Sequence, residues 1–134
     1  MKICIVVSNY YKDISNDLLK GVTAELKNKG YKKLTIKLVS GAFEIPNIIS
    51  KNINKFNAFI ALGCIIKGQT DHYFFISDAV TKGLMNLSIQ SKKPIGFGVL
   101  TCNNLKQARE RSSILKKNKG KEVAIGLISL LKNK

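Results

Sequence analysis

The sequence has few of the residues that mark a disulfide-bonded or metal-binding protein. Its 134 residues include one histidine and three cysteines, and no two cysteines form a Cys-x-x-Cys pair. An odd number of cysteines without that spacing argues against a disulfide framework and against a zinc site. Reduced thiols in a cytosolic protein fit this pattern best. We therefore expect no bound metal.

Long uncharged apolar runs are also missing. The longest, residues 56–66, contains Asn57 and is far shorter than the ~20 residues that a membrane-spanning helix needs. The apolar run at residues 3–7 is too short for the core of a signal peptide and ends at Ser8. We therefore expect a cytoplasmic protein that does not contact membranes.

Acidic residues and arginine are scarce. Eight Asp and Glu stand against 23 basic residues, and only Arg109 and Arg111 are arginine, so the formal net charge is +15. Such a charge would suit nucleic-acid binding. However, the lysines are spread over every segment, and recognition of bases favours arginine. The chain is also rich in isoleucine and asparagine, which, like lysine, have AT-rich codons. We therefore attribute the many lysines to a drift of codon usage, and we expect no nucleic-acid partner.

What the sequence does contain is a regular alternation of strand-like and helix-like segments. Short apolar runs at residues 2–8, 33–39, 58–66 and 94–100 alternate with helical patterns at about 13–29, 45–53, 76–87, 105–115 and 124–131. This alternation is typical of a parallel sheet with helices on both faces. We predict one α/β domain over residues 1–134, a three-layer sandwich around a four-stranded parallel sheet in the flavodoxin-like order 2-1-3-4.

The residues that follow the four strands carry most of the chemistry. In open parallel sheets, ligands bind beyond the carboxyl ends of the strands. Those ends are followed by glycine, aromatic, carboxylate, hydroxyl and imidazole groups, in residues 9–11, 41–44, 67–72 and 101–103. The sequence therefore predicts a polar site along one edge of the sheet.

A phosphate site is predicted where Gly68, Gln69 and Thr70 lead into a helix, because free N–H groups and the helix dipole attract anions. The alternative is that Thr70 is a plain N-cap. Arg111 favours the phosphate, since guanidinium binds phosphate through two hydrogen bonds. Its alternative role is a surface salt bridge, for example to Glu110.

The single histidine, His72, lies in the first turn of the same helix, where the dipole should favour neutral imidazole. Neutral imidazole can exchange protons near pH 7. A capping or surface role is the alternative. In the same way, Tyr10, Phe43 and Phe97 could stack on a flat heterocycle or could fill a core or an interface.

Read together, these segments closely resemble the lumazine synthase family. The resemblance rests on GAFEIP at residues 41–46, LGCIIKGQTDHY at 62–73, GVLT at 98–101, Gln107-x-x-x-Arg111, and Asn118-Lys119-Gly120. Each motif alone is weak, but their order and separation are specific, and they cover nearly the whole chain. Tyr10 departs from the usual Phe or Trp of the family, and Tyr11 stands where Asn is frequent.

The resemblance implies a reaction and a site. The family condenses 5-amino-6-(D-ribitylamino)uracil with 3,4-dihydroxy-2-butanone 4-phosphate, releases phosphate and water, and uses no metal or organic cofactor. The pyrimidine would stack on Tyr10, with Ala42, Phe43 and Glu44 beside the ribityl chain and the backbone of Ile65, Ile66 and Lys67 at the ring edge. His72 would transfer protons, and Gly68, Gln69, Thr70 and Arg111 would hold the phosphate.

The resemblance also implies a homo-oligomer, a pentamer or a multiple of five. In the family, the equivalents of Phe97, Arg111 and Lys119 come from the adjacent subunit. Two features of the sequence conflict about shell formation. Shell-forming members of the family have a segment before the first strand, which this sequence lacks, whereas members that stop at pentamers have an insertion before the equivalent of Asn118, which this sequence also lacks. Two alternatives stay open from the residues alone, a non-catalytic flavodoxin-like phosphate- or nucleotide-binding module and a non-catalytic shell protein.

Overall fold

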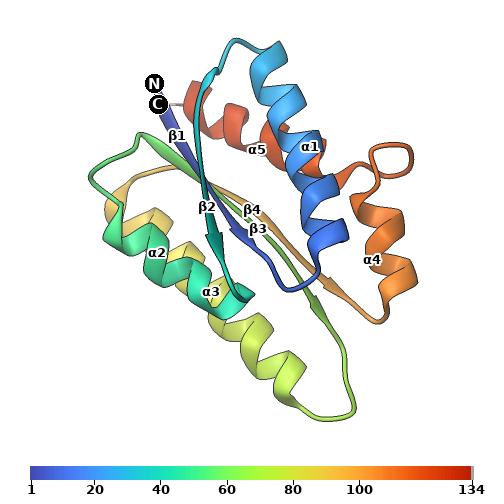
Figure 1. Cartoon of the computed structure of the whole chain (residues 1–134). Coiled ribbons are helices and arrows are strands. Elements are labelled where there is room, and N and C mark those ends of the chain that lie inside the picture. Colours follow the sequence, from blue (N-terminus) through green and yellow to red (C-terminus); the bar gives the residue numbers. More distant parts are fainter. Residues whose placement is uncertain (134) are drawn as a thin grey trace.

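The computed structural model describes residues 1–133 as a single parallel sheet between two layers of helices (Figure 1). The elements are β1 (Lys2–Ser8), α1 (Lys12–Asn28), β2 (Lys33–Val39), the short 3-10 helix η1 (Ala42–Glu44), α2 (Ile45–Lys51), β3 (Ala58–Ile66), α3 (His72–Ser91), β4 (Ile95–Cys102), α4 (Leu105–Ser112) and α5 (Lys119–Lys132). The strand order is β2-β1-β3-β4 and every pairing is parallel. The predicted α/β class and strand order are confirmed.

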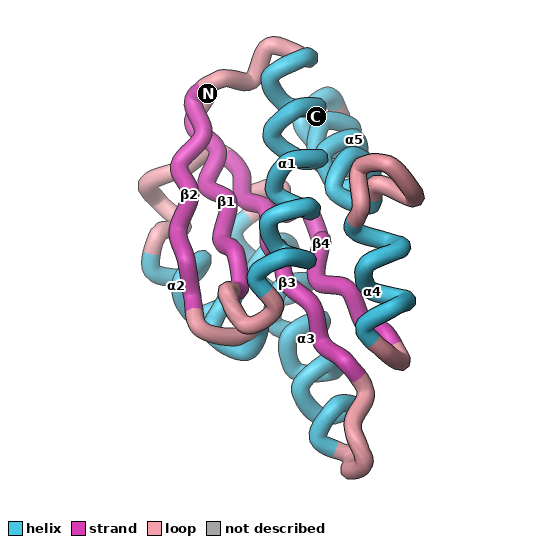
Figure 2. Tube along the Cα trace, turned by 45° about the vertical axis from the view of Figure 1, so that its right-hand side comes forward, coloured by secondary structure: helices cyan, strands magenta, loops and turns pink. Residues whose placement is uncertain are grey.

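Two apolar clusters hold the layers together, one on each face of the sheet. The first lies under α1, α4 and α5 and is built around Ile5, Leu18 and Leu127, all fully buried. The second lies under α2 and α3 and is built around Phe59 and Ile49. Figure 2 shows the helices on the two sides of the strands. Strands β1 and β3 are buried on both faces, which is why their sequences are almost continuously apolar.

Strand β2 lies at one edge of the sheet and is more exposed than its alternating pattern suggests. Ile36 is 47% exposed and Leu38 is 67% exposed. Only β1 pairs with this strand, so its other edge has no neighbouring strand within residues 1–133. The alternation of apolar residues therefore identified β2 as a strand. It did not show that the helices cover only part of this strand.

The two C-terminal helices differ from the predicted boundaries. α5 begins at Lys119, five residues before the predicted helical pattern. α4 ends at Ser112 and not near Leu115, because the backbone turns to an extended conformation at Ser113. The following loop closes when the Asn118 N–H donates to the Ser113 carbonyl at 2.9 Å. Asn118 then adopts a left-handed conformation, with φ of 46°, and its side chain accepts from the Lys121 N–H. This turn sets the direction in which α5, beginning with Lys119, leaves the loop.

A close contact between α1 and α5 fixes the start of α5. A Cβ atom added at Gly120 would overlap the carbonyl oxygen of Leu18. Glycine is therefore required there by the packing of the two helices. Lys119, the residue before Gly120, lies beside β4 at the edge of the sheet.

No helix in the described part of the chain is both long and apolar enough to cross a lipid bilayer.

Candidate active site

The site predicted from the strand ends is a cleft of about 310 Å³ at the carboxyl edge of the sheet. Three of the four predicted segments contribute to it. The lining residues are Tyr10, Tyr11, Gly41, Ala42, Phe43, Cys64, Ile65, Ile66, Gly68, Thr70, His72, Tyr73 and Ile76. The β1–α1 loop, η1 and the β3–α3 loop therefore face a common volume.

The floor of the cleft is apolar and its rim is polar. Ala42 and Cys64 are buried, whereas His72, Gly68 and Thr70 are exposed. Two aromatic side chains extend from the rim into solvent: Tyr10 is 71% exposed and Phe43 is 59% exposed. An exposed ring over an apolar floor can cover a flat ligand, while the polar rim can bind its substituents.

The end of β3 presents unpaired backbone groups to the cleft. Pairing with β1 stops at Leu62, whereas pairing with β4 continues to Ile66. The Lys67 N–H donates to the Cys102 carbonyl at 2.9 Å, so the backbone groups of Lys67 point toward β4. Because neighbouring residues of a strand point their backbone groups to opposite sides, those of Ile66 point away from β4, where β1 has already ended. The Ile66 amide is thus available to a ligand, while that of Lys67 is engaged within the sheet.

The loop before α3 has the form of an anion site. The helix begins at His72, and the Thr70 hydroxyl accepts from the His72 N–H at 3.3 Å. The N-cap residue is Asp71, which makes no side-chain cap hydrogen bond, so the alternative of Thr70 as a plain N-cap is wrong. Gly68 and Thr70 line the cleft. The α3 N-terminus directs its positive dipole end toward this region. Gln69 is exposed and does not line the cleft.

Two other predicted residues, Glu44 and Lys67, have side chains that contact neighbouring residues of this chain and do not line the cleft. The Glu44 carboxylate accepts a hydrogen bond from the Ser40 hydroxyl at 3.0 Å, which holds it beside η1. The Lys67 ammonium lies 5.6 Å from the centre of the Phe74 ring, over the first turn of α3. Both groups remain exposed at the edge of the cleft.

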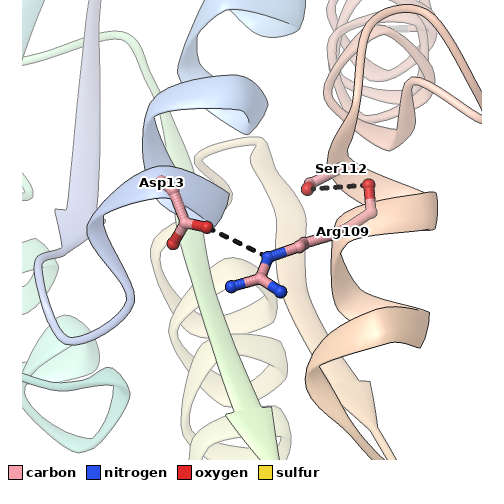
Figure 3. A network of polar contacts seen from close by, with 3 residues as sticks. All are labelled: Asp13, Arg109 and Ser112. Carbon is pink, nitrogen blue, oxygen red and sulfur yellow. Dashed lines mark hydrogen bonds and ion pairs between the residues drawn. The ribbon is translucent and has the colours of Figure 1, made fainter.

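The two arginines of α4 have different surroundings. Arg109 is exposed, and its Nε atom lies 3.3 Å from Oδ2 of Asp13 at the start of α1 (Figure 3). Arg111 is half-buried and, among residues 1–133, has no carboxylate partner. Its Nη1 atom donates to the Thr101 carbonyl at 3.4 Å and lies 3.9 Å from the Cys102 sulfur. Within residues 1–133 Arg111 thus forms no salt bridge to Glu110 or to another acid, and most of its guanidinium donors have no partner there.

Phe97, Arg111 and Lys119 do not line the cleft. Phe97 and Lys119 lie together in a separate groove of about 340 Å³ between β4 and α5. Phe97 is 47% exposed and also borders a second groove, between β4 and α3. The structure thus divides the predicted residues into two groups, one around the cleft and one along the β4 edge.

The cysteine in the cleft is a weak nucleophile. Burial raises the pKa of the Cys64 thiol to about 12, and the neighbouring Cys102 contributes to the increase. A thiol with this pKa stays protonated at neutral pH, and the thiolate is the reactive form. Within the described residues there is also no group of three His, Cys, Asp or Glu that could hold a metal ion. Among the residues that line the cleft, His72 carries the only imidazole, the side chain used most often for general acid–base catalysis.

Some cleft residues were not among the predicted substrate-binding residues. Tyr11 lies in the strand-end segment 9–11 that was predicted to face the site, and Tyr73 follows His72, so their positions in the chain were the available signal. Cys64 and Ile76 fit the apolar patterns of a strand and a helix, which made them candidates for the core. A pattern of buried residues does not show where a core opens into a cleft.

Comparison with known proteins matches this chain to one family over its whole length. The family model for 6,7-dimethyl-8-ribityllumazine synthase matches residues 1–134. The chain is also similar to a 6,7-dimethyl-8-ribityllumazine synthase from Buchnera aphidicola, with 45% identity over 135 residues. That alignment covers 96% of this chain and 84% of the relative.

Proposed function

The chain belongs to the 6,7-dimethyl-8-ribityllumazine synthase family, and from this premise we propose how its residues carry out the reaction. The protein is a transferase of riboflavin biosynthesis. It condenses 5-amino-6-(D-ribitylamino)uracil with 3,4-dihydroxy-2-butanone 4-phosphate and releases phosphate. The observation that carries the proposed mechanism is the cleft, where Tyr10, the free Ile66 backbone and His72 face one volume.

The pyrimidine substrate is held on the β1 side of the cleft. Its ring stacks on Tyr10 and its edge hydrogen-bonds to backbone groups at the end of β3, where Ile66 has no strand partner. The ribityl chain lies along Ala42, Phe43 and Glu44. The aryl amine is thereby directed toward the α3 side, where the second substrate binds.

The phosphate of the second substrate is held by Gly68, Gln69 and Thr70 at the N-terminus of α3, together with Arg111. His72, the first residue of that helix, stands between the two substrate sites and moves protons during imine formation and phosphate elimination. Most of the rate enhancement comes from holding two flexible polar molecules in a reactive orientation. His72 should contribute about 10²-fold or less where water can substitute for it.

The reaction itself is the first test. Purified protein is expected to form the lumazine chromophore from the two substrates with no metal added, and to keep this activity in excess chelator, because its acid–base groups are side chains. Absorbance of the product measures the rate. Tight binding of either substrate without turnover would favour the non-catalytic binding module, and activity that chelator abolishes would contradict the metal-free mechanism.

We further propose that the active unit is a homopentamer or a multiple of five. The support is the separation of the site into two groups, because Phe97 and Lys119 lie in the β4-edge groove and not at the cleft. Exposed apolar side chains lie along this edge: Leu130, 48% exposed, lines that groove, and Met85, 59% exposed, lines the neighbouring groove between β4 and α3. In a head-to-tail ring, the β4 edge of one subunit would meet the cleft of the next and complete it.

Sedimentation is expected to give the mass of five chains or a multiple of five, since a folded monomer would leave the β4-edge groove open and the cleft incomplete. Replacing Met85 and Leu130 by lysine should shift the distribution toward smaller species and lower the activity in parallel. A monomer that sediments as a single species with full activity would refute the shared site. Its circular dichroism spectrum would show whether the subunit is folded.

We propose a cytoplasmic location and a single domain over residues 1–134. The support for the first is chemical: Cys4, Cys64 and Cys102 are all buried free thiols. The second agrees with the family match, which extends over the same residues.

A further inference from the structure

Tyr10 and Tyr11 form an aromatic pair at the mouth of the cleft. Their ring centres are 4.9 Å apart and the ring planes meet at 73°, so the edge of one ring contacts the face of the other. This is a favourable geometry for two aromatic rings. The two residues differ in exposure: Tyr10 is 71% exposed, whereas Tyr11 is half-buried. One ring of the pair therefore lies largely in solvent, whereas the other is partly covered by the protein.

The backbone on either side of this pair is held in place. The Asn9 N–H donates to the Val39 carbonyl at 2.7 Å, and the Ser15 N–H donates to the Tyr11 carbonyl at 3.0 Å. The Ser15 hydroxyl also bonds to the Ser8 carbonyl at the end of β1. With the loop tied to the sheet and to the first turn of α1, the freedom left to Tyr10 is mainly that of its side chain.

Tyr11 is fixed by packing. Its ring packs against the apolar cluster under α1, α4 and α5, and the Cys64 thiol lies close to it. Burial raises the pKa of the Tyr11 phenol above its ordinary value. The position of the ring is thus determined by the core and not by the loop.

An exposed ring that must stack on a ligand loses rotamer freedom when the ligand binds. A neighbouring ring that already restricts its orientation reduces this loss. We propose that Tyr11 is a positioning residue that holds the Tyr10 ring through their edge-to-face contact and so prepares it to stack on the flat heterocyclic substrate. The inference rests on the proposed role of Tyr10 in the cleft.

A double-mutant cycle tests the inference. Tyr11→Leu removes the ring but keeps an apolar group against the core, and Tyr11→Phe keeps the ring and removes only the hydroxyl. The variants are compared as assembled protein, with the ribitylaminouracil varied at saturating dihydroxybutanone phosphate. Tyr11→Leu is expected to raise KM for the pyrimidine about 3- to 10-fold with kcat within about 2-fold, which corresponds to the loss of one aromatic pair. Tyr11→Phe should stay within about 2-fold of wild type in both constants.

The decisive comparison is made in the Tyr10→Ala background. There Tyr11→Leu should change KM by less than about 2-fold, because Tyr11 has no ring left to position. An undiminished effect in that background would overturn the inference, since Tyr11 would then act on the ligand or the core directly. An unaltered KM in the single Tyr11→Leu variant would overturn it as well. Should Tyr11→Leu not assemble, Tyr11→Met provides the same comparison with a flexible apolar side chain.

The experiment separates this inference from the proposed site. If Tyr10→Ala itself leaves KM unchanged, the assignment of Tyr10 to the pyrimidine site fails and the positioning role fails with it. If Tyr10→Ala raises KM and Tyr11→Leu does not, only the positioning role is wrong.

Discussion

Rings refolded from an equal mixture of His72→Ala and Arg111→Ala chains are expected to recover about a quarter of wild-type activity, although each variant alone is strongly impaired. In a head-to-tail ring each site would take His72 from one chain and Arg111 from the next. With random assembly, each of the two groups is intact in half of the sites, so both are intact in about one site in four. If His72 contributes about 10²-fold, the mixed rings should exceed the His72→Ala parent by about 25-fold, because a quarter of wild-type activity is compared with about a hundredth.

The expectation follows from where the two residues lie in one subunit. His72 lines the cleft, whereas Arg111 is directed toward the end of β4 and does not. The mixture is unfolded and refolded together, and mass measurement on differently tagged chains verifies that both are in the same ring. Rings formed separately and then mixed are the control and should show only the average of the parents. If verified mixed rings also show no more than that average, His72 and Arg111 act within one subunit.

Arg111→Ala is expected to lower kcat/KM for dihydroxybutanone phosphate by about 10²-fold or more, because the phosphate loses a partner that forms charge-assisted hydrogen bonds in a partly desolvated site. Arg111→Lys should recover only part of the loss, since an ammonium keeps the charge but cannot form the paired hydrogen bonds of guanidinium. Initial rates with each substrate varied in turn locate the effect. The constants for the pyrimidine substrate should change much less.

The chain provides a matched control for this variant in Arg109, on the same helix two residues earlier. Arg109 and Asp13 form an exposed ion pair, and such pairs contribute little to stability. Arg109→Ala should therefore leave kcat/KM within about 2-fold of wild type. Equal losses from both substitutions would indicate a general effect of positive charge near the cleft, and the specific role of Arg111 would then be wrong.

The periodicity of the sequence was sufficient to predict the strands. The predicted boundaries of β1, β2 and β3 agree with the structure at both ends, and β4 differs by one or two residues at each end. Apolar runs that are buried on both faces of a parallel sheet are short, nearly continuous and bounded by polar residues. The predicted strand ends also located the cleft, because the carboxyl ends of parallel strands meet at one edge.

The sequence was less informative about which side chains share a surface. Arg109 and Arg111 are the same residue type two positions apart, but a helix points such side chains in different directions. Arg109 therefore reaches Asp13, whereas Arg111 reaches the end of β4. In the same way, Phe97 follows the strand pattern of β4, but it is exposed because, within residues 1–133, no further strand pairs with β4 at that edge.

The types of residue along the chain were therefore enough to predict the class of fold, the strand order, the edge of the sheet where the cleft lies and, through the family motifs, the reaction. Those features depend on local periodicity and on short contiguous motifs. The division between the cleft and the β4-edge groove, the free guanidinium of Arg111 and the ring pair of Tyr10 and Tyr11 required the folded chain. Each depends on the direction of side chains from elements far apart in the sequence, and packing sets that direction.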